Sequence, residues 1–166
     1  MGLLIRDAGK ADAAACAEVY APYVRDTVIS FETTPPGAGE MAERIAAAHL
    51  WLVAEDAGTV LGYAYAGRFM ARAAYRWACE VSVYLDREHR RAGLGKALYG
   101  VLLPRLAALG FTTAVAGMTL PNEASAGLHR AMGFEPVGTY RRIGWKFGAW
   151  HDVAWTQLSL VDEEHA

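Results

Sequence analysis

A glycine-rich turn in the second half of the chain has the residue types needed to bind a phosphate group. Residues 89–100 read HRRAGLGKALYG and follow CEVSVYL, an apolar run typical of a strand, which ends at Leu85. The first amides of a helix are unpaired and point outward, and the helix dipole adds partial positive charge there. Gly93 and Gly95 lack a Cβ, which would let an anion approach the backbone closely. The segment is therefore a candidate binding site for a phosphate or diphosphate.

Three types of phosphate-binding turn can be compared with this segment. A Walker loop requires GxxxxGK[ST], but Ala97 stands where the hydroxyl is needed. The dinucleotide fingerprint GxGxxG fails at its third glycine, which is Leu98. The pattern [RQ]xxGx[GA] between a strand and a helix is satisfied in full by Arg90, Gly93 and Gly95. For these six residues alone, a glycine-rich helix start with solvated arginines is the alternative interpretation.

The preceding strand contributes a lone carboxylate that could act as a general base. In WACEVSVYL the two-residue period places Glu80, Ser82 and Tyr84 on one face and Cys79 on the other. Partial desolvation would raise the pKa of such a glutamate toward the range in which a base works near neutral pH. The alternative interpretation is an outward charge on a half-exposed strand.

A histidine and three arginines are further candidates. His129 lies four residues after Ser125, so both would share one face of a short helix, where the imidazole could give or relay a proton. A hydrogen-bonded structural histidine is the alternative.

Arginines that could bind the carboxylate of an amino acid recur at four-residue spacing in GRFMARAAYRW: Arg68, Arg72 and Arg76. A guanidinium group can donate two parallel hydrogen bonds to a carboxylate. For Arg68 and Arg76 we favour the alternative interpretation, in which these side chains are exposed to solvent and bind no ligand.

Alternating and helical hydrophobic patterns predict the elements that must position these residues. Strands are expected over residues 3–8, 51–56, 59–67, 77–85, 112–118, 136–143 and 153–160. Helices are expected over about residues 11–24, 38–49, 93–109 and 122–133, with Asn122 able to cap the last one. The order predicts a mixed α/β fold in one domain, residues 1–166, with a single central sheet of six to seven strands flanked by four helices. The final residues, VDEEHA, are expected to be a solvated tail.

Composition excludes several classes of function. The 166 residues have a formal net charge of −2, so no general basic surface for nucleic acid is expected. The longest uncharged stretch, residues 106–122, contains glycines, a proline and threonines, so no membrane span is expected. The first residues, MGLLIRD, have Arg6 where a myristoylation signal needs Ser or Thr and lead into no apolar signal core, so no targeting segment is expected. Cys16 and Cys79 have neither a metal-ligand nor a disulfide spacing, which favours reduced thiols in a cytoplasmic protein without a metal.

Seven segments, in one order along most of the chain, resemble the GNAT superfamily of acyl-CoA-dependent N-acetyltransferases. They are SFET, RxAY, EVSVY, HRRAGLG, LPNEAS, LHRAMGF and GWKFGAWHDV. The match is closest to the branch of phosphinothricin and methionine sulfoximine/sulfone N-acetyltransferases, which confer resistance to such antimetabolites. The resemblance implies a GNAT fold, acetyl-CoA as donor, a small amino acid or analogue as acceptor, and a sheet splayed between the strands that end at Leu85 and Met118.

The resemblance also implies residue roles at the donor site. Main-chain amides of the turn would hold the CoA diphosphate, one strand would pair with the pantetheine arm, and the last helix would contact the arm from the other side. The residues implied are Val83, Tyr84, Leu85, Arg90, Arg91, Ala92, Gly93, Leu94, Gly95, Lys96, Asn122 and Ser125.

The catalytic residues implied are Glu80 as a base acting through water and His129 as an acid, where many superfamily members have tyrosine. Tyr84 is a weaker alternative donor. Cys79 would face away from Glu80, so direct transfer in a ternary complex is favoured over an acyl-cysteine intermediate. The acceptor residues implied are Phe31, Glu32, Phe69, Arg72 and Tyr75.

Other consequences of the resemblance stay open. Met70 stands where one branch member has lysine, which leaves the preference among the three acceptors undecided. Residues 150–152, WHD, resemble a segment near the family's subunit contact and imply a homodimer. A peptide or protein N-acetyltransferase, which would need an open groove, and a non-catalytic acyl-CoA sensor, which could dispense with Glu80, are the alternative functions.

Overall fold

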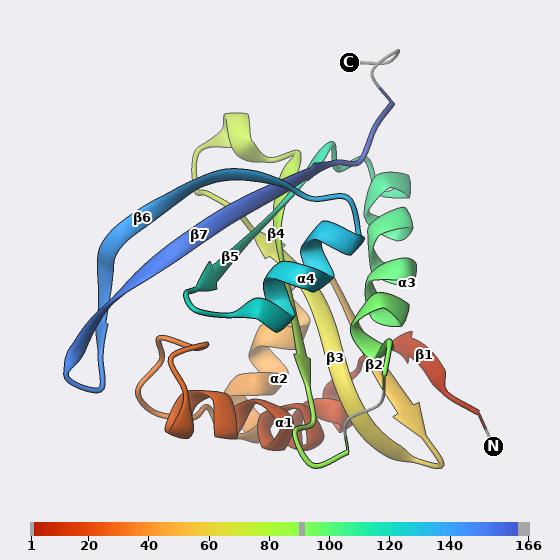
Figure 1. Cartoon of the computed structure of the whole chain (residues 1–166). Helices are drawn as coiled ribbons and strands as arrows, with labels where there is room; N and C mark the ends of the chain where they lie inside the picture. Colours follow the sequence, from red (N-terminus) through yellow and green to blue (C-terminus); the bar gives the residue numbers. More distant parts are fainter. Residues whose placement is uncertain (1, 90–91, 163–166) are drawn as a thin grey trace.

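The computed structural model describes residues 2–89 and 92–162 (Figure 1). The described chain forms seven strands: β1 (Leu4–Asp7), β2 (Leu50–Asp56), β3 (Thr59–Arg68), β4 (Ala78–Leu85), β5 (Thr113–Thr119), β6 (Glu135–Lys146) and β7 (Ala149–Ser159). It also forms four α-helices, α1 (Ala13–Asp26), α2 (Ala38–Ala47), α3 (Leu94–Ala108) and α4 (Glu123–Ala131), and two 3-10 turns, η1 (Lys10–Asp12) and η2 (Ala73–Tyr75). The expected mixed α/β fold with one sheet is confirmed; most of the expected tail, residues 163–166, lies outside the described residues.

The sheet divides between β4 and β5. Its strand order is β1-β2-β3-β4-β5-β7-β6, and β4–β5 is the parallel pair. Those two strands pair only from Ala78 with Thr113 to Glu80 with Val115. Beyond this point β4 continues to Leu85 and β5 to Thr119 without further pairing, so the strands diverge (Figure 1). The expected splay is therefore present, and its apex lies at Glu80.

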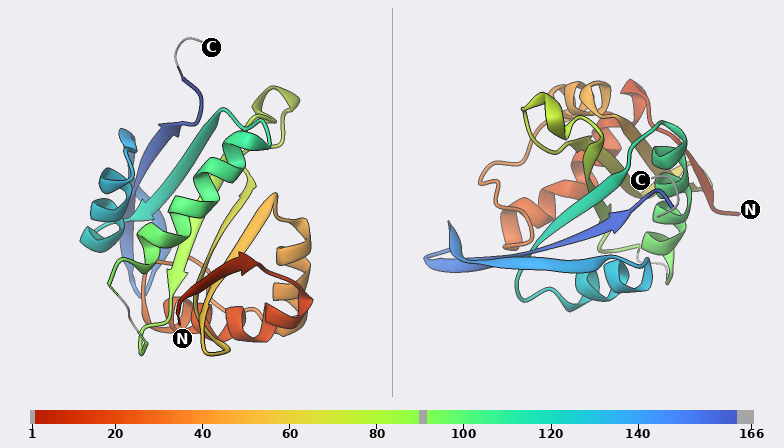
Figure 2. Two further views of the ribbon diagram at one scale, coloured as in Figure 1. Left: turned by 90° about the vertical axis from the view of Figure 1, so that its right-hand side faces the viewer. Right: turned by 90° about the horizontal axis from the view of Figure 1, so that it is seen from above.

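Two helical layers cover the sheet (Figure 2). One core cluster packs α3 against the side of β4 that carries Cys79 and Val81. A second cluster packs α1 and α2 against the opposite side, where Trp51 and Tyr63 lie. Cys16 and Cys79 are buried free thiols, as expected. No helix within the described residues is long and apolar enough to cross a membrane.

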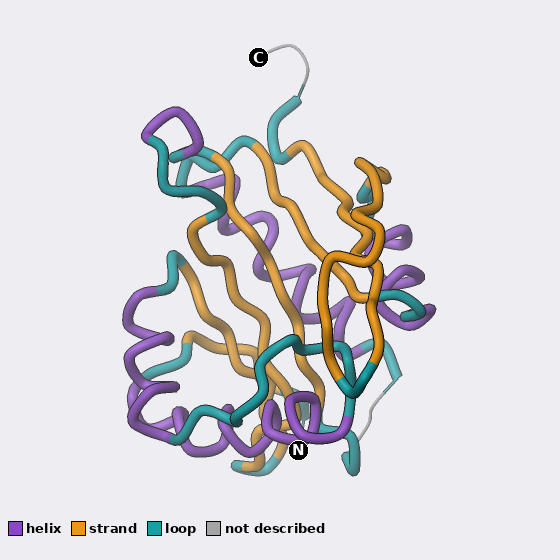
Figure 3. The backbone as a smooth tube through the Cα atoms, turned by 90° about the vertical axis from the view of Figure 1, so that its left-hand side faces the viewer, coloured by secondary structure: helices purple, strands orange, loops and turns teal. Residues whose placement is uncertain are grey.

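The last hairpin is longer than the sequence patterns predicted. Strands were expected over residues 136–143 and 153–160, but β6 runs to Lys146 and β7 starts at Ala149. Phe147 and Gly148 connect them, both with positive φ (+53° and +73°), which is the requirement of a tight two-residue turn. A phenylalanine at such a position gives no local turn signal. The resulting β6–β7 hairpin extends past the end of the sheet to the loop that follows α1 (Figure 3).

Candidate functional site

A cavity of about 390 Å³ lies where β4 and β5 separate. Its walls come from β4, β5, α4 and the end of α1. The sequence-predicted residues that line it are Val83, Tyr84, Leu85, Ala92, Asn122, Ser125 and His129. The fork of the sheet thus brings together predicted residues from three separate segments of the sequence: β4, the glycine turn and α4.

The main chain of β4 offers polar groups to this cavity. The amide of Asp86 donates to the carbonyl of Leu61 on β3 at 2.8 Å. Along an antiparallel pair of strands, residues that hydrogen-bond to the neighbouring strand alternate with residues that do not. The main-chain groups of Val83 and Leu85 therefore point away from β3, toward the gap between β4 and β5. The Tyr23 hydroxyl donates to the Leu85 carbonyl at 2.5 Å. The groups available to an extended ligand are therefore the amide and carbonyl of Val83 and the amide of Leu85.

The glycine turn stands at one end of the cavity. Gly93 is the N-cap of α3 with φ +79°, a left-handed conformation that favours glycine. The Leu94 side chain is buried in the core, so this residue can offer only its main chain, while Lys96 is exposed. Ala92 lines the cavity directly. The predicted residues Arg90 and Arg91 lie outside the described residues.

The second glycine of the turn has a packing role as well. A Cβ on Gly95 would lie 3.0 Å from Cδ2 of Leu128 on α4. Helices α3 and α4 therefore approach closely at this point, which places the first amides of α3 beside the α4 wall of the cavity. The bare backbone of Gly95 accommodates this approach whether or not a ligand is bound.

Glu80 lies at the apex of the fork, opposite Gly67 of β3 and Val115 of β5. It shares a strand face with Tyr84, whose ring contacts Tyr20 and Tyr23 of α1 edge-on, so the carboxylate faces the α1–α2 side of the sheet. No hydrogen bond or ion pair holds it within the described residues. Burial raises its pKa, as predicted from the sequence for a general base.

His129 is hydrogen-bonded through both ring nitrogens. Its Nδ1 lies 2.7 Å from the Ser125 carbonyl, which can only accept, so Nδ1 carries a proton. Its Nε2 lies 3.0 Å from the Tyr99 hydroxyl. Burial lowers its pKa and favours the neutral ring, whose Nε2 then accepts from Tyr99. This arrangement favours a structural histidine over the expected acid, because its one proton is already engaged.

The start of α4 follows the sequence expectation. Asn122 caps the helix, its Oδ1 accepting from the Ser125 amide at 3.2 Å. The Ser125 hydroxyl lies 3.3 Å from His129 Nδ1, which confirms that these two side chains share one helical face. Asn122 and Ser125 both border the cavity opposite β4.

An aromatic cluster borders the cavity on the β5 side. The Phe69 ring lies 5.7 Å from the Tyr75 ring and 6.3 Å from the Trp155 ring of β7, measured between centroids. A Cβ on Gly117, which lines the cavity, would lie 3.0 Å from the Trp155 ring. Trp155 therefore connects two predicted acceptor residues, Phe69 and Tyr75, to the cavity wall.

Arg72 is an exposed guanidinium at the start of η2, and no carboxylate within the described residues pairs with it. The arginines four residues away have local partners instead. Arg68 Nε donates to the Met70 carbonyl at 3.2 Å, and the Arg76 guanidinium lies 5.5 Å from the Trp77 ring centroid. Since only a three-residue 3-10 turn forms here, the three arginines do not stack as a helix would require.

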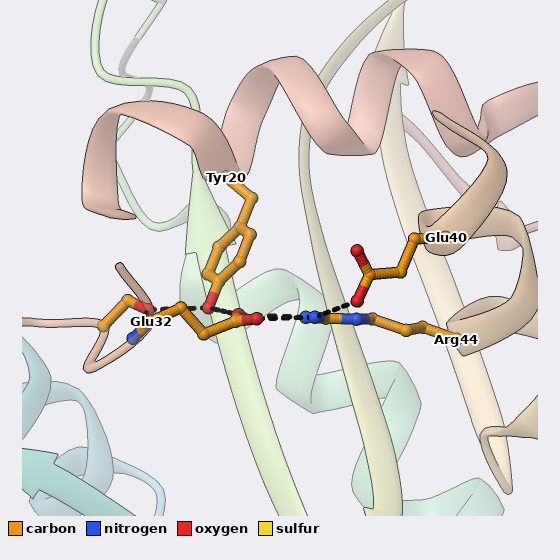
Figure 4. A network of polar contacts seen from close by, with 5 residues as sticks. Tyr20, Glu32, Glu40 and Arg44 are labelled. Carbon is orange, nitrogen blue, oxygen red and sulfur yellow. Dashed lines mark hydrogen bonds and ion pairs between the residues drawn. The ribbon is translucent and has the colours of Figure 1, made fainter. Parts of the chain in front are cut away.

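Phe31 and Glu32 lie on the loop between α1 and α2 and are not among the residues that line the cavity. Glu32 accepts from Arg44 at 2.5 and 2.9 Å and from the Tyr20 hydroxyl (Figure 4). Arg44 also donates to Glu40 at 2.9 Å. The Arg44 guanidinium lowers the pKa of Glu32. The ionised Glu32 therefore joins the loop to α2, which the sequence did not indicate.

Three residues near the site were missed from the sequence: Tyr23, Tyr99 and Lys146. Tyr99 is fully buried in α3, four residues after Gly95, and its hydroxyl reaches His129. Lys146 is the sole charge in GWKFGAW, a signal that could have marked it. Each acts through a partner far away in the sequence, which local patterns do not reveal.

Comparison with known proteins agrees with this geometry. Residues 5–155 match the model of the acetyltransferase (GNAT) domain. The chain is 43% identical over 156 residues to phosphinothricin N-acetyltransferase of Streptomyces viridochromogenes, covering 92% of this chain and 85% of the relative. It is 38% identical over 165 residues to L-methionine sulfoximine/L-methionine sulfone acetyltransferase of Pseudomonas aeruginosa, covering 96% of each.

A solved structure shares the whole fold. The crystal structure of a GNAT superfamily phosphinothricin acetyltransferase from Sinorhizobium meliloti, in complex with AcCoA, has a TM-score of 0.93 and 40% identity, covering 100% of this chain and 92% of that one. The resemblance inferred from seven short segments is confirmed over nearly the full length. The chain belongs to the GNAT family of acetyltransferases.

Proposed function

We propose that the protein moves the acetyl group of acetyl-CoA to the α-amine of a small amino acid or analogue of the phosphinothricin, methionine sulfoximine or methionine sulfone type, acting as a single domain. The observation that carries the proposal is Glu80, a half-buried carboxylate with raised pKa at the apex of the fork. The relatives described above support the acceptor class. A non-catalytic sensor would have no use for such a base.

The donor fits the site by its chemistry. The first amides of α3 and the left-handed Gly93 form an anion-binding site suited to the diphosphate of CoA. The amide and carbonyl of Val83 and the Leu85 amide can pair with the pantetheine amides in the gap. Asn122 and Ser125 border the same cavity from α4.

Acetyl transfer to an amine requires proton movements that these residues can supply. An ammonium cannot attack, so Glu80, directly or through water, takes a proton from the acceptor nitrogen. The nitrogen forms its bond to the thioester carbon, negative charge develops on the carbonyl oxygen, and the carbon–sulfur bond breaks as the carbonyl re-forms. Tyr84 donates the proton to sulfur in this proposal, because it lines the cavity and burial raises its pKa, which keeps it protonated. The second proton of the acceptor nitrogen then passes through water to the Tyr84 oxygen, which restores the phenol. Cys79 faces the opposite core, so no acyl-cysteine forms.

A thiol-release assay tests the proposed function. Purified protein with acetyl-CoA should release CoA in the presence of phosphinothricin, methionine sulfoximine or methionine sulfone, and the acetylated acceptor should appear by mass spectrometry. Peptides with free N-termini serve as the comparison. Comparable kcat/KM for peptides would replace the small-acceptor assignment, and acetyl-CoA binding without transfer to any amine would indicate a sensor.

We also propose a homodimer formed through the β6–β7 hairpin. Large apolar side chains are exposed along it: Val137, Tyr140, Ile143, Trp145, Phe147 and Trp150. Strand β6 is an edge of the sheet, so its outer main chain is open to pairing. An exposed apolar patch on a strand edge suits a self-complementary contact with a second copy.

The buried free thiols Cys16 and Cys79 support a reducing, cytoplasmic location for the enzyme.

A further inference from the structure

A buried lysine joins two distant parts of the chain. Lys146 ends β6 and is 4% exposed. Its Nζ donates to the carbonyls of Val24 and Ser30, both at 2.7 Å. Val24 lies in the last turn of α1, where carbonyls lack helical partners and the dipole favours a cation. Lys146 thus ties the β6–β7 hairpin to the end of α1 and to the loop that follows it.

Stability alone does not account for a lysine at this place. Taking an ammonium out of water is costly, and apolar residues of similar volume are often equal or better in such sites. Burial accordingly lowers the pKa of Lys146, while the Glu32 carboxylate raises it. The ammonium also lies 4.9 Å from the Phe147 ring centroid. Its two carbonyl partners therefore point to a role in holding the loop.

The loop held in this way carries Phe31 directly against the hairpin. A Cβ on Gly144 of β6 would overlap the Phe31 ring, so the ring rests on bare backbone. On β7, the His151 ring lies 6.3 Å from the Phe31 ring, measured between centroids. The hairpin therefore forms a wall for Phe31, and Lys146 fastens the adjoining Ser30 to that same hairpin.

The other end of the loop is fixed independently. Glu32 is bound by Arg44 of α2 and Tyr20 of α1 (Figure 4). The Tyr20 hydroxyl also lies 2.7 Å from the Ser30 hydroxyl. Phe31 therefore stands between two anchored residues: Ser30, held by Lys146 and Tyr20, and Glu32, held by Arg44 and Tyr20.

We propose that Lys146 is a positioning residue for the acceptor: by holding the Ser30 carbonyl, it fixes Phe31 at the acceptor side of the site. The inference rests on the proposed function and on the acceptor role of Phe31 that the family resemblance implies. It assigns to the β6–β7 hairpin a part in acceptor binding through Phe31, whose ring the hairpin contacts at Gly144 and whose neighbour Ser30 it holds by a hydrogen bond.

The test is the Lys146→Met variant of the full chain, which keeps the length of the side chain and removes its donors. The KM for the acceptor, with methionine sulfone as probe, should rise about tenfold, because small misplacements of positioning groups have effects of this order or larger. The KM for acetyl-CoA should stay unchanged. Arg141→Met, which removes an exposed cation from the same strand, is the matched control and should leave both constants unchanged.

Two further measurements separate positioning from misfolding. Amide hydrogen exchange over residues 28–33 should be faster in Lys146→Met, and this readout does not depend on the identity of the acceptor. If Lys146→Met does not fold, Gly144→Ala displaces the Phe31 ring without touching the ammonium and should give the same split between the two KM values. An unchanged acceptor KM in a folded variant, equal rises in both constants, or unchanged exchange would overturn the inference. Failure of the wild type to acetylate any amino acid would refute the proposed function instead.

Discussion

At the scale of single residues, Glu80 combines an unfavourable environment with a useful position. Glu80→Gln should keep the shape and remove the base, so turnover near pH 7 should fall by about 100- to 10,000-fold while acetyl-CoA still binds. The rate of the variant should climb with pH as free amine becomes more abundant. Turnover measured over a range of pH with saturating acetyl-CoA tests this. A Glu80→Gln variant with wild-type turnover and an unaltered pH profile would show that the carboxylate is only structural.

The Glu80→Gln variant should be at least as stable to unfolding as the wild type. Because the folded-state pKa of Glu80 is raised, the native state holds its proton more tightly than the unfolded chain does. Ionising Glu80 therefore costs stability as pH rises above the unfolded pKa of about 4.3. The difference in melting temperature between Glu80→Gln and wild type should be larger at pH 7 than at pH 4, which thermal unfolding at both values checks.

His129 should behave as a structural residue. Its folded-state pKa is lowered, so wild-type stability should fall as pH drops below the unfolded value of about 6.5. His129→Phe should lose this pH dependence and should be less stable at pH 7 by about 1–3 kcal/mol, because Tyr99 is left without its acceptor. Chemical denaturation at pH 5.5 and 7.5 measures both effects. A selective loss of rate at high pH in the same variant would restore the acid role.

At the scale of elements, the glycine turn is the feature that can be tested most cleanly. Gly93→Ala forces a Cβ into a left-handed conformation and should shift the first amides of α3, raising the KM for acetyl-CoA roughly tenfold, about 1.4 kcal/mol. Gly100→Ala is the matched control, since it lies in the middle of α3 with open space around it and should stabilise the helix. Equal acetyl-CoA saturation for the two folded variants would remove the diphosphate assignment.

The order of the elements was predictable because its signals are local. Alternation in β4 placed Glu80 and Cys79 on opposite faces. The strands expected over residues 51–56 and 59–67 pair across a tight turn at Ala57 and Gly58, which both have positive φ. The boundary errors fell where the turn lacks a local signal, as at Phe147. The contacts of Lys146 with Val24 and Ser30 join residues more than a hundred positions apart, so no periodicity could have indicated them.

At the scale of the whole molecule, the fork in the sheet organises the two halves of the site. The glycine turn and α4 gather the proposed donor-binding groups around the gap, while Glu80 faces the side of α1 and α2. The apex at Glu80 is the point where a group held in the gap could meet an acceptor on that side. The β6–β7 hairpin then extends past the sheet to the loop of Phe31, so the surface proposed for dimer contact is the same element that positions this loop.

Dimer formation can be tested on the exposed face of this hairpin. Trp150 is 49% exposed and packs edge-on against Trp145, with ring centroids 5.2 Å apart. Trp150→Glu would place a charge in the proposed contact and should convert the dimer to monomer in sedimentation velocity runs at micromolar concentration, because burying an unpaired charge is unfavourable. Leu4→Glu, at an apolar position 50% exposed on β1 at the other edge of the sheet, is the control and should stay dimeric. A wild type that sediments as a monomer at all concentrations would contradict the dimer outright.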